Sequence, residues 1–305
     1  MSTSKMQATQ ATKNTSRMGL ANVKRGPIAS PHRVVLYGAE GVGKTTFAAS
    51  APSPIFIGTE DGSGALDVAR FPRPEAWSDI LEAVRELTDA EHDYQTVVVD
   101  SLDWAEPLLW AHVCDEHKQP SIEAFGYGRG YVEALQTARR FLGALELLQS
   151  KRGMHVVLIA HAHLKKYANP AGEDWDRWTM KVQDKFGGAV REWADTVLFA
   201  SWEQYATQVD GRTKGVSTGR RLIYTTKTAA YEAKNRFALP ESLDLSWSAF
   251  AKSVDRNRKA AAEIRALLAS DAEKLAKFEA WAASPRPMHE MVAMRDRIQE
   301  ESKTK

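Results

Sequence analysis

The sequence contains a single cysteine, Cys114, among its 305 residues. One thiol cannot form a disulfide framework within a chain, and such scarcity is typical of a reducing cytoplasm. The sequence also lacks any apolar run of the roughly 20 residues that a membrane-spanning helix requires. Its formal net charge is only +2, so any binding of nucleic acid must depend on local basic patches. These absences exclude a disulfide-rich secreted domain and predict a cytoplasmic protein with no membrane partner.

Both ends of the chain differ in composition from the middle. The first 33 residues contain Ser, Thr, Lys and Arg but no Asp or Glu, and they lack the apolar core of a secretory signal. This composition fits an organelle transit peptide or, as we favour, a disordered basic tail, which we place at residues 1–30. Residues 248–305 are rich in Ala, Lys and Glu and predict a C-terminal helical segment. The core is therefore expected at residues 31–247.

Short apolar runs alternate with amphipathic segments throughout this core. The hydrophobic fraction of 43% and the charged fraction of 26% are typical of a globular protein. Strands are predicted at residues 34–37, 54–57, 96–99, 155–160 and 196–200, with a β-rich run at 221–226. Helices are predicted at residues 45–51, 75–90, 103–118 and 132–150. Fully apolar strands separated by helices predict an α/β fold, in which helices cover both faces of a mostly parallel sheet.

A glycine-rich motif follows the first of these strands. Residues 38–45 read Gly-Ala-Glu-Gly-Val-Gly-Lys-Thr and fit the phosphate-loop pattern GxxxxGK[ST]. Glycines let the backbone curl so that its amides, with the start of the next helix, face phosphate oxygens. A chance match is the alternative, and the position between strand and helix argues against it. We predict that ATP and Mg²⁺ bind at Gly38, Ala39, Glu40, Gly41, Val42, Gly43, Lys44, Thr45 and Thr46.

Acidic residues follow two other strands of the predicted sheet. Asp100 ends the apolar run of residues 97–99, where a carboxylate can hold the magnesium shell together with the Thr45 hydroxyl. Glu60 lies just beyond residues 54–57, and a carboxylate there can polarise the attacking water. Glu60 is therefore the candidate catalytic base, with Asp61 as a competitor and a solvated acidic turn as the alternative.

A histidine follows the strand at residues 155–160. A polar side chain at this strand tip can contact the γ-phosphate and relay hydrolysis to the next loop. His161 is therefore a candidate sensor that acts in catalysis with Lys44. A purely structural histidine is the alternative, and His163 is a second candidate.

These residues resemble the RecA-like ATPases. In that family the phosphate loop has an acid two residues after the first glycine and two threonines after the lysine, as Glu40, Thr45 and Thr46 are placed here. The catalytic glutamate of RecA follows a strand similar to residues 55–60, and its magnesium-binding acid precedes a serine, as Asp100 does. The sensor of the family is usually glutamine, whereas this chain has His161.

The chain also resembles a phage family of nucleotide-binding ATPases that includes the RecA-like single-strand annealing proteins of the Sak type. The resemblance covers about residues 33–240, with matching stretches at 97–101, 127–148, 157–161, 186–199 and 231–237. It implies a RecA-like P-loop NTPase core with a C-terminal helical appendage, ATP hydrolysis, and a homo-oligomeric ring or filament. A single-strand DNA-binding protein is a further candidate partner, and the host cytoplasm is the expected location if a phage encodes the chain.

Two loops hold single-stranded DNA in RecA-like proteins, and by position they correspond here to residues 125–131 and 165–188. The first combines aromatic rings that can stack on bases with a cation, and the second combines lysines with several acids. A packed turn and an ordinary surface loop are the alternatives. The candidate DNA-binding residues are Phe125, Tyr127, Arg129, Tyr131, Lys165, Lys166, Lys181 and Lys185.

Three late basic residues, Lys227, Lys234 and Arg236, resemble residues that reach a neighbour's ATP across the interface in such assemblies. A solvated face and DNA contacts are the alternatives. Taken together, the sequence predicts an ATPase that binds single-stranded DNA and promotes phage-type recombination by strand annealing or pairing. The alternatives are a nucleotide-dependent loader or switch acting on a replication protein, and a nucleotide kinase, for which the sequence shows no arginine-rich lid.

Overall fold

The computed structural model describes residues 18–19, 22–23, 30–209, 212–282 and 288–303. Residues 31–305 form a compact unit separate from residues 1–30. The basic tail predicted at residues 1–30 lies mostly outside the described residues. Within the described residues, no helix combines the length and the apolar composition needed to cross a bilayer.

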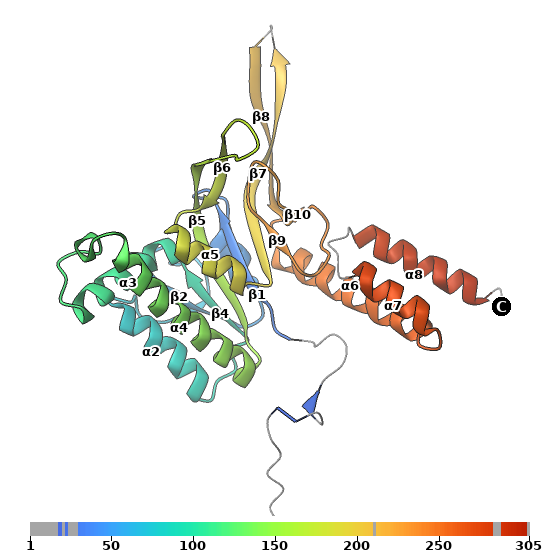
Figure 1. The fold of residues 1–305 in the computed structure, drawn as a ribbon, viewed down its shortest axis with the longest axis horizontal. Helices are drawn as coiled ribbons and strands as arrows, with labels where there is room; N and C mark the ends of the chain where they lie inside the picture. The colour runs from blue at the N-terminus through green and yellow to red at the C-terminus, as the bar shows by residue number, and fades with distance from the viewer. Residues whose placement is uncertain (1–17, 20–21, 24–29, 210–211, 283–287, 304–305) are drawn as a thin grey trace, which may run out of the picture. The chain divides into compact units, whose positions relative to one another are not determined.

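A mostly parallel sheet forms the centre of residues 31–305 (Figure 1). Its strands are β1 (Arg33–Gly38), β2 (Pro54–Gly58), β3 (Ala69–Arg70), β4 (Thr96–Asp100), β5 (His155–Tyr167), β6 (Trp175–Met180), β7 (Thr196–Val209), β8 (Arg212–Tyr224), β9 (Lys234–Asn235) and β10 (Ser242–Asp244). The order is β10-β8-β7-β1-β5-β4-β2-β3, with β6 paired to β5 and β9 to β7. Neighbours from β7 to β3 are parallel, and β8 and β10 are antiparallel. The predicted α/β class is confirmed.

Helices cover both faces of this sheet. They are α1 (Lys44–Ala49), α2 (Trp77–Asp89), α3 (Leu102–Glu116), α4 (Arg129–Arg152), α5 (Asp184–Trp193), α6 (Trp247–Leu267), α7 (Ala272–Ala282) and α8 (Met288–Lys303), with a 3-10 turn at Glu123–Phe125. Val35 and Tyr37 of β1 pack in the layer formed by α2 to α5, which also contains the buried Cys114. Val34 and Leu36 pack in the layer formed by α1 and α6. Because successive side chains of a strand point to opposite faces, residues 34–37 of β1 are all apolar.

The register of the parallel strands brings their carboxyl ends together. Gly38, at the end of β1, lies opposite His161 on β5 and Ala200 on β7. Gly58, at the end of β2, lies opposite Asp100 at the end of β4. All of these ends therefore meet at one edge of the sheet, where ligands bind in open α/β folds.

Strand β5 is longer than the sequence predicted. It does not end at residue 160 but continues to Tyr167 and pairs antiparallel with β6, after which α5 follows. Residues 165–188 are therefore a hairpin and a helix rather than a loop. The hairpin is packed, because Arg177 and Met180 of β6 are only 9% and 3% exposed.

The β7–β8 hairpin also extends well beyond the predicted strands at 196–200 and 221–226. Its outer part pairs residues such as Thr207 and Lys214. These residues are polar, so the segment has no apolar alternation that would predict a strand.

The first half of α6 packs on the sheet, and its second half packs on α7 and α8. Phe250 and Val254 are fully buried in the layer of Phe47, whereas Ala260 and Ile264 pack with Phe278 of α7. The apolar contacts of α6 therefore join the core predicted at residues 31–247 to the helical segment predicted at residues 248–305.

Replacing Phe250 by alanine tests whether α6 belongs to the core. The Phe250 ring is fully buried and lies 6.4 Å from the ring of Phe47, so we expect Phe250→Ala to lower the free energy of unfolding by about 3–5 kcal/mol. Tyr205→Ala is the control, because Tyr205 is 54% exposed and its loss should change stability by less than about 0.5 kcal/mol. Urea unfolding measures both values, and equal effects would contradict this role of α6.

Candidate functional site

The glycine-rich loop begins at the end of β1 and continues directly into α1. Gly43 has a φ of 108°, which residues with a side chain rarely adopt. A Cβ on Gly38 would lie 2.2 Å from the carbonyl oxygen of Ala200, so β1 and β7 can approach this closely only with glycine there. The backbone therefore requires glycine at two positions of the motif, in a loop whose amides can converge on an anion.

Lys44 lies across this loop and is only 6% exposed. Its Nζ donates hydrogen bonds to the carbonyl oxygens of Gly38 at 3.1 Å and Ala39 at 3.0 Å. Burial lowers the pKa of Lys44, while the carboxylates of Asp100 and Glu60 oppose that shift. An incoming phosphate can replace the two neutral carbonyl acceptors with anionic oxygens, which bind the ammonium group more strongly.

Thr45 and Asp100 form the part of the site that fits a magnesium ion. The Thr45 hydroxyl donates to Asp100 Oδ2 at 2.8 Å, and the buried Oδ1 has no hydrogen-bond partner among the described residues. Burial raises the pKa of Asp100, and the Thr45 hydrogen bond opposes that shift. Magnesium is commonly held by one or two carboxylates, substrate phosphates and water. A hydroxyl beside a carboxylate oxygen with an unused acceptor is compatible with that ligand set.

Thr59, which the sequence analysis missed, fixes the loop after β2 to the end of β4. Its hydroxyl donates to the carbonyl oxygen of Ser101 at 2.8 Å and accepts from the Ser101 amide at 2.9 Å. The Thr59 amide donates to the carbonyl oxygen of Asp100 at 2.8 Å, and the Asp100–Ser101 peptide bond is cis. These bonds place the adjoining Glu60 beside Asp100.

His161 is held between two carboxylates. Its Nδ1 lies 2.8 Å from Asp103 Oδ2, and its backbone amide donates to Asp103 Oδ1 at 2.9 Å. On the other side of the ring, Nε2 lies 3.9 Å from Glu60 Oε1. Asp103 was not predicted, although its place in the first turn of α3, three residues after Asp100, returns it to the strand edge. Asp103, His161 and Glu60 therefore form one row.

The charges in this row depend on one another. The hydrogen bond to Asp103 raises the pKa of His161, and burial opposes that shift. Burial raises the pKa of Glu60, and the nearby His161 opposes it. Burial would also raise the pKa of Asp103, but the hydrogen bonds from His161 outweigh it and leave this pKa lowered. The row favours a cationic His161 and a Glu60 with an increased affinity for a proton, as a general base requires.

Most of the predicted nucleotide site lines one cavity of about 680 Å³. The predicted residues that line it are Gly41, Gly43, Lys44, Thr45, Thr46, Glu60 and His161. Gly38 and Ala39 contribute instead the carbonyl groups that hold Lys44. Val42 is fully buried beneath the loop, and Glu40 is exposed outside the cavity.

The cavity also contains residues that the sequence did not single out. Arg73 lines it and makes no ion pair with any described residue, and Trp104 lines it with a side chain that is 51% exposed. Asp61, the competing candidate base, lines the cavity but is exposed, whereas the Glu60 side chain is 21% exposed. His163 does not line it. The position of Glu60 supports its role as the candidate base.

The aromatic residues of the first proposed DNA loop are not all available for stacking. The ring of Phe125 packs edge-on against His117, and the ring of Tyr131 packs edge-on against Trp110. Both rings pack against the main core, and the Tyr131 hydroxyl donates to Glu123 at 2.7 Å. The packing of the Phe125 and Tyr131 rings therefore favours the alternative of a packed turn over base stacking.

Tyr127 and Arg129 are the exposed members of that segment. Tyr127 is fully exposed at the turn before α4, and Arg129 is exposed in the first turn of that helix. These two side chains alone remain DNA-binding candidates in residues 125–131.

The lysines of the second proposed DNA loop lie on or near the β5–β6 hairpin. Lys165 is ion-paired with Asp184, and Lys166 with Asp174 at 3.3 Å. Lys181 and Lys185 are exposed and make no ion pair with any described residue. The acids predicted to weaken the positive field of this span therefore neutralise two of its four candidate lysines.

The late basic residues are engaged within the chain. Lys234 Nζ donates to the carbonyl oxygens of Arg191 and Glu192, both at 2.8 Å, at the end of α5. Arg236 pairs with Asp195 at 3.3 Å, and Lys227 is exposed. Lys234 has this structural role, so it is a poor candidate for reaching a neighbouring subunit.

The row of three side chains predicts the pH dependence of ATP hydrolysis. In Asp103→Asn, the pKa of His161 falls because its carboxylate partner is lost, so Glu60 loses a nearby cation. The pKa of Glu60 then rises, because this loss outweighs the weaker repulsion from Asp103. We expect the acidic limb of the pH–kcat profile, where Glu60 becomes protonated, to move to higher pH.

The control for this prediction is a double-mutant cycle. In a His161→Gln background, Asp103→Asn should no longer move the acidic limb upward. An unchanged limb in the Asp103→Asn single variant would contradict the proposed link between these residues.

Comparison with known proteins places this site in a family. A family model described as an AAA domain matches residues 30–237. The SPbeta prophage-derived uncharacterized protein YorG of Bacillus subtilis (strain 168) is 25% identical over 217 residues, which cover 67% of this chain and 59% of that protein. The chain thus spans less than two thirds of the length of that relative.

The crystal structure of the RadB recombinase is similar at 16% sequence identity, with a TM-score of 0.38, over 64% of this chain and 80% of that one. The family model covers more than half of the chain and includes the phosphate loop, Glu60, Asp100 and His161. The chain therefore belongs to the AAA domain family, a family of P-loop NTPases.

Proposed function

We propose that this protein hydrolyses ATP and uses its nucleotide state to control binding of single-stranded DNA, in phage-type recombination by strand annealing or pairing. It would act as a ring or filament of identical subunits in the cytoplasm, that of the host if a phage encodes it. The observation that carries the proposal is that β5 runs without interruption from His161, in the nucleotide cavity, into the β5–β6 hairpin, just beyond which lie the exposed Lys181 and Lys185.

Hydrolysis would use the groups already placed around the cavity. Lys44 would bind the β- and γ-phosphates, and Thr45 and Asp100 would hold magnesium, which when bound neutralises phosphate charge. Glu60 would accept a proton from the attacking water, which its raised pKa favours. The cationic His161 would face the γ-phosphate beside it and sense its presence.

Coupling to DNA would use the backbone of His161. Its amide donates to Asp103, and its carbonyl oxygen accepts from the Lys181 amide at 2.8 Å. A shift of His161 on loss of the γ-phosphate would therefore move the base of the hairpin directly. It would then act as a two-state element of the kind that converts nucleotide state into loop position.

The hairpin carries two half-buried aromatic rings, those of Tyr167 and Trp175, which lie 4.7 Å apart near its outer end. Arg177 is not a free cation, because its guanidinium lies 4.3 Å from the Tyr167 ring and pairs with Glu232 at 2.9 Å. Rings that stack on bases, beside cations that contact phosphates, bind single strands without sequence preference. Lys181 and Lys185 would supply free positive charge to that surface.

Glu60→Gln tests the assignment of the base. We expect this variant to bind ATP with unchanged affinity. Its rate of hydrolysis should fall by about a hundredfold or more, because the amide cannot accept the proton. Asp61→Asn is the matched control and should retain turnover within about twofold, since Asp61 is exposed. Calorimetry and phosphate release measure the two properties. Full turnover by Glu60→Gln would assign the role to another acid.

Charge reversal of the two lysines beside the hairpin, which are unpaired among the described residues, tests DNA binding. Wild-type protein should retain labelled single strands on filters, with retention falling steeply as salt rises. Lys181→Glu with Lys185→Glu should reduce retention about tenfold or more at moderate salt, because each reversal replaces a phosphate contact by repulsion. Lys252→Glu, an exposed change on α6, is the control and should have little effect.

The same assay separates the proposal from its alternatives when it is run with Lys44→Ala, with and without ATP, alongside annealing of complementary oligonucleotides. Retention that depends on ATP in wild type, and not in Lys44→Ala, would support nucleotide control. Absence of salt-sensitive retention in every nucleotide state would instead favour a loader that acts on a replication protein. Phosphate transfer to a nucleoside monophosphate would favour a kinase.

A further inference from the structure

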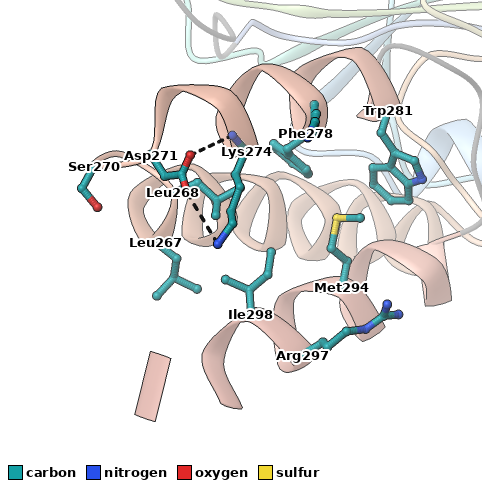
Figure 2. Close-up of a pocket in the computed structure, with 11 residues that line it drawn as sticks. Leu267, Leu268, Ser270, Asp271, Lys274, Phe278, Trp281, Met294, Arg297 and Ile298 are labelled. Atoms are coloured by element: carbon teal, nitrogen blue, oxygen red, sulfur yellow. Dashed lines mark hydrogen bonds and ion pairs between the residues drawn. The ribbon is translucent and has the colours of Figure 1, made fainter. Parts of the chain in front are cut away.

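The C-terminal helices form an apolar groove far along the chain from the ATP site. Figure 2 shows side chains from α7, α8 and the end of α6 converging on one cavity of about 570 Å³. The apolar residues that line it are Leu267, Leu268, Phe278, Trp281, Met294 and Ile298. Phe278 and Leu268 are only 3% and 7% exposed and form its floor, whereas the other four are half-buried walls. A cavity of this size accepts a few large side chains rather than a folded surface.

The rim of this groove is mostly cationic. Lys274, Lys277 and Arg297 line it, against a single acid, Asp271. Lys274 is paired with Asp271 at 3.5 Å, and Lys277 is paired with Glu273 at 2.7 Å. Arg297 is exposed and makes no ion pair with any described residue, so its charge is available to a ligand.

We propose that this groove binds a short acidic peptide segment of a partner protein, with bulky apolar side chains entering the cavity and carboxylates on the cationic rim. An apolar cavity with a charged rim is the usual form of a peptide-binding groove. The rim gives specificity and faster association, and the cavity supplies most of the affinity.

Charge distinguishes this occupant from others. The first 33 residues of the chain contain Lys and Arg and no Asp or Glu, so the cationic rim would repel them. Single-stranded DNA requires ring faces on which bases stack. The Phe278 ring is buried in the floor, Trp281 already stacks on it with ring centroids 6.0 Å apart, and the other walls, Leu267, Met294 and Ile298, are not aromatic. A peptide with both apolar and acidic side chains can place the apolar ones against the walls and the acidic ones on the cationic rim.

The test measures binding of a fluorescein-labelled peptide, Asp-Glu-Leu-Asp-Phe-Glu-Leu-Ile-Asp-Asp, to the full chain by fluorescence anisotropy. We expect saturable binding that weakens about tenfold in Arg297→Glu, because a carboxylate on the rim repels the peptide. Lys259→Glu is the matched control. It reverses one exposed charge on α6 outside the groove and should change the affinity by less than about twofold.

Two further comparisons complete the test. A peptide with Ser in place of the four apolar residues should bind at least about tenfold more weakly, and Lys44→Ala should bind the acidic peptide as wild type does, since the groove does not depend on ATP. Circular dichroism establishes that each variant is folded.

Several outcomes would overturn the proposal. They are equal binding of a peptide with Lys in place of its acids, equal weakening by Arg297→Glu and Lys259→Glu, and no binding to wild type. Displacement of the peptide by a thymidine oligonucleotide whose own binding requires Arg297 would assign the groove to DNA. Self-association that both Arg297→Glu and the peptide abolish, seen by sedimentation, would assign it to a second copy of this chain.

Discussion

The parallel register of β2, β4, β5 and β1 is the constraint on which the rest of the site depends. These strands are apolar on both faces, so they are stable only when helices cover the sheet on both sides. Their carboxyl ends then meet at one edge of the sheet, where Gly38, Gly58, Asp100 and His161 lie together. The chemistry is therefore placed by the packing of residues that take no part in it.

Contacts between loops refine that placement. Thr59 joins the ends of β2 and β4, and Asp103 joins the start of α3 to β5. Each contact uses both a side chain and a backbone group, so rotating one residue disturbs the position of the next. The nucleotide cavity and the base of the β5–β6 hairpin share His161. Its side chain lines the cavity, and its backbone carbonyl oxygen accepts from the Lys181 amide after β6.

The features that sequence could predict are those with a local signal. Apolar runs followed by glycine or an acid predicted the strands, the phosphate loop, Asp100 and Glu60, because each signal lies within a few residues. Asp103 and Thr59 act on partners 58 and 42 residues away, and no local pattern reports such a contact. The outer parts of β7 and β8 were missed because polar residues there hide the strand period. For Phe125 and Tyr131 the sequence left DNA stacking and a packed turn both open, because composition does not show which rings are packed.

The buried Cys114 has a consequence for how the protein can be observed. It is the only thiol in the chain and is 8% exposed on α3, the helix whose first turn carries Asp103. Burial raises the pKa of this thiol, so the folded form holds little of the reactive thiolate. Alkylation of the native protein should therefore be slow, and local opening of α3 should speed it. The rate of alkylation at the Cys114 sulfur therefore reports how often α3, the helix that carries Asp103, opens locally.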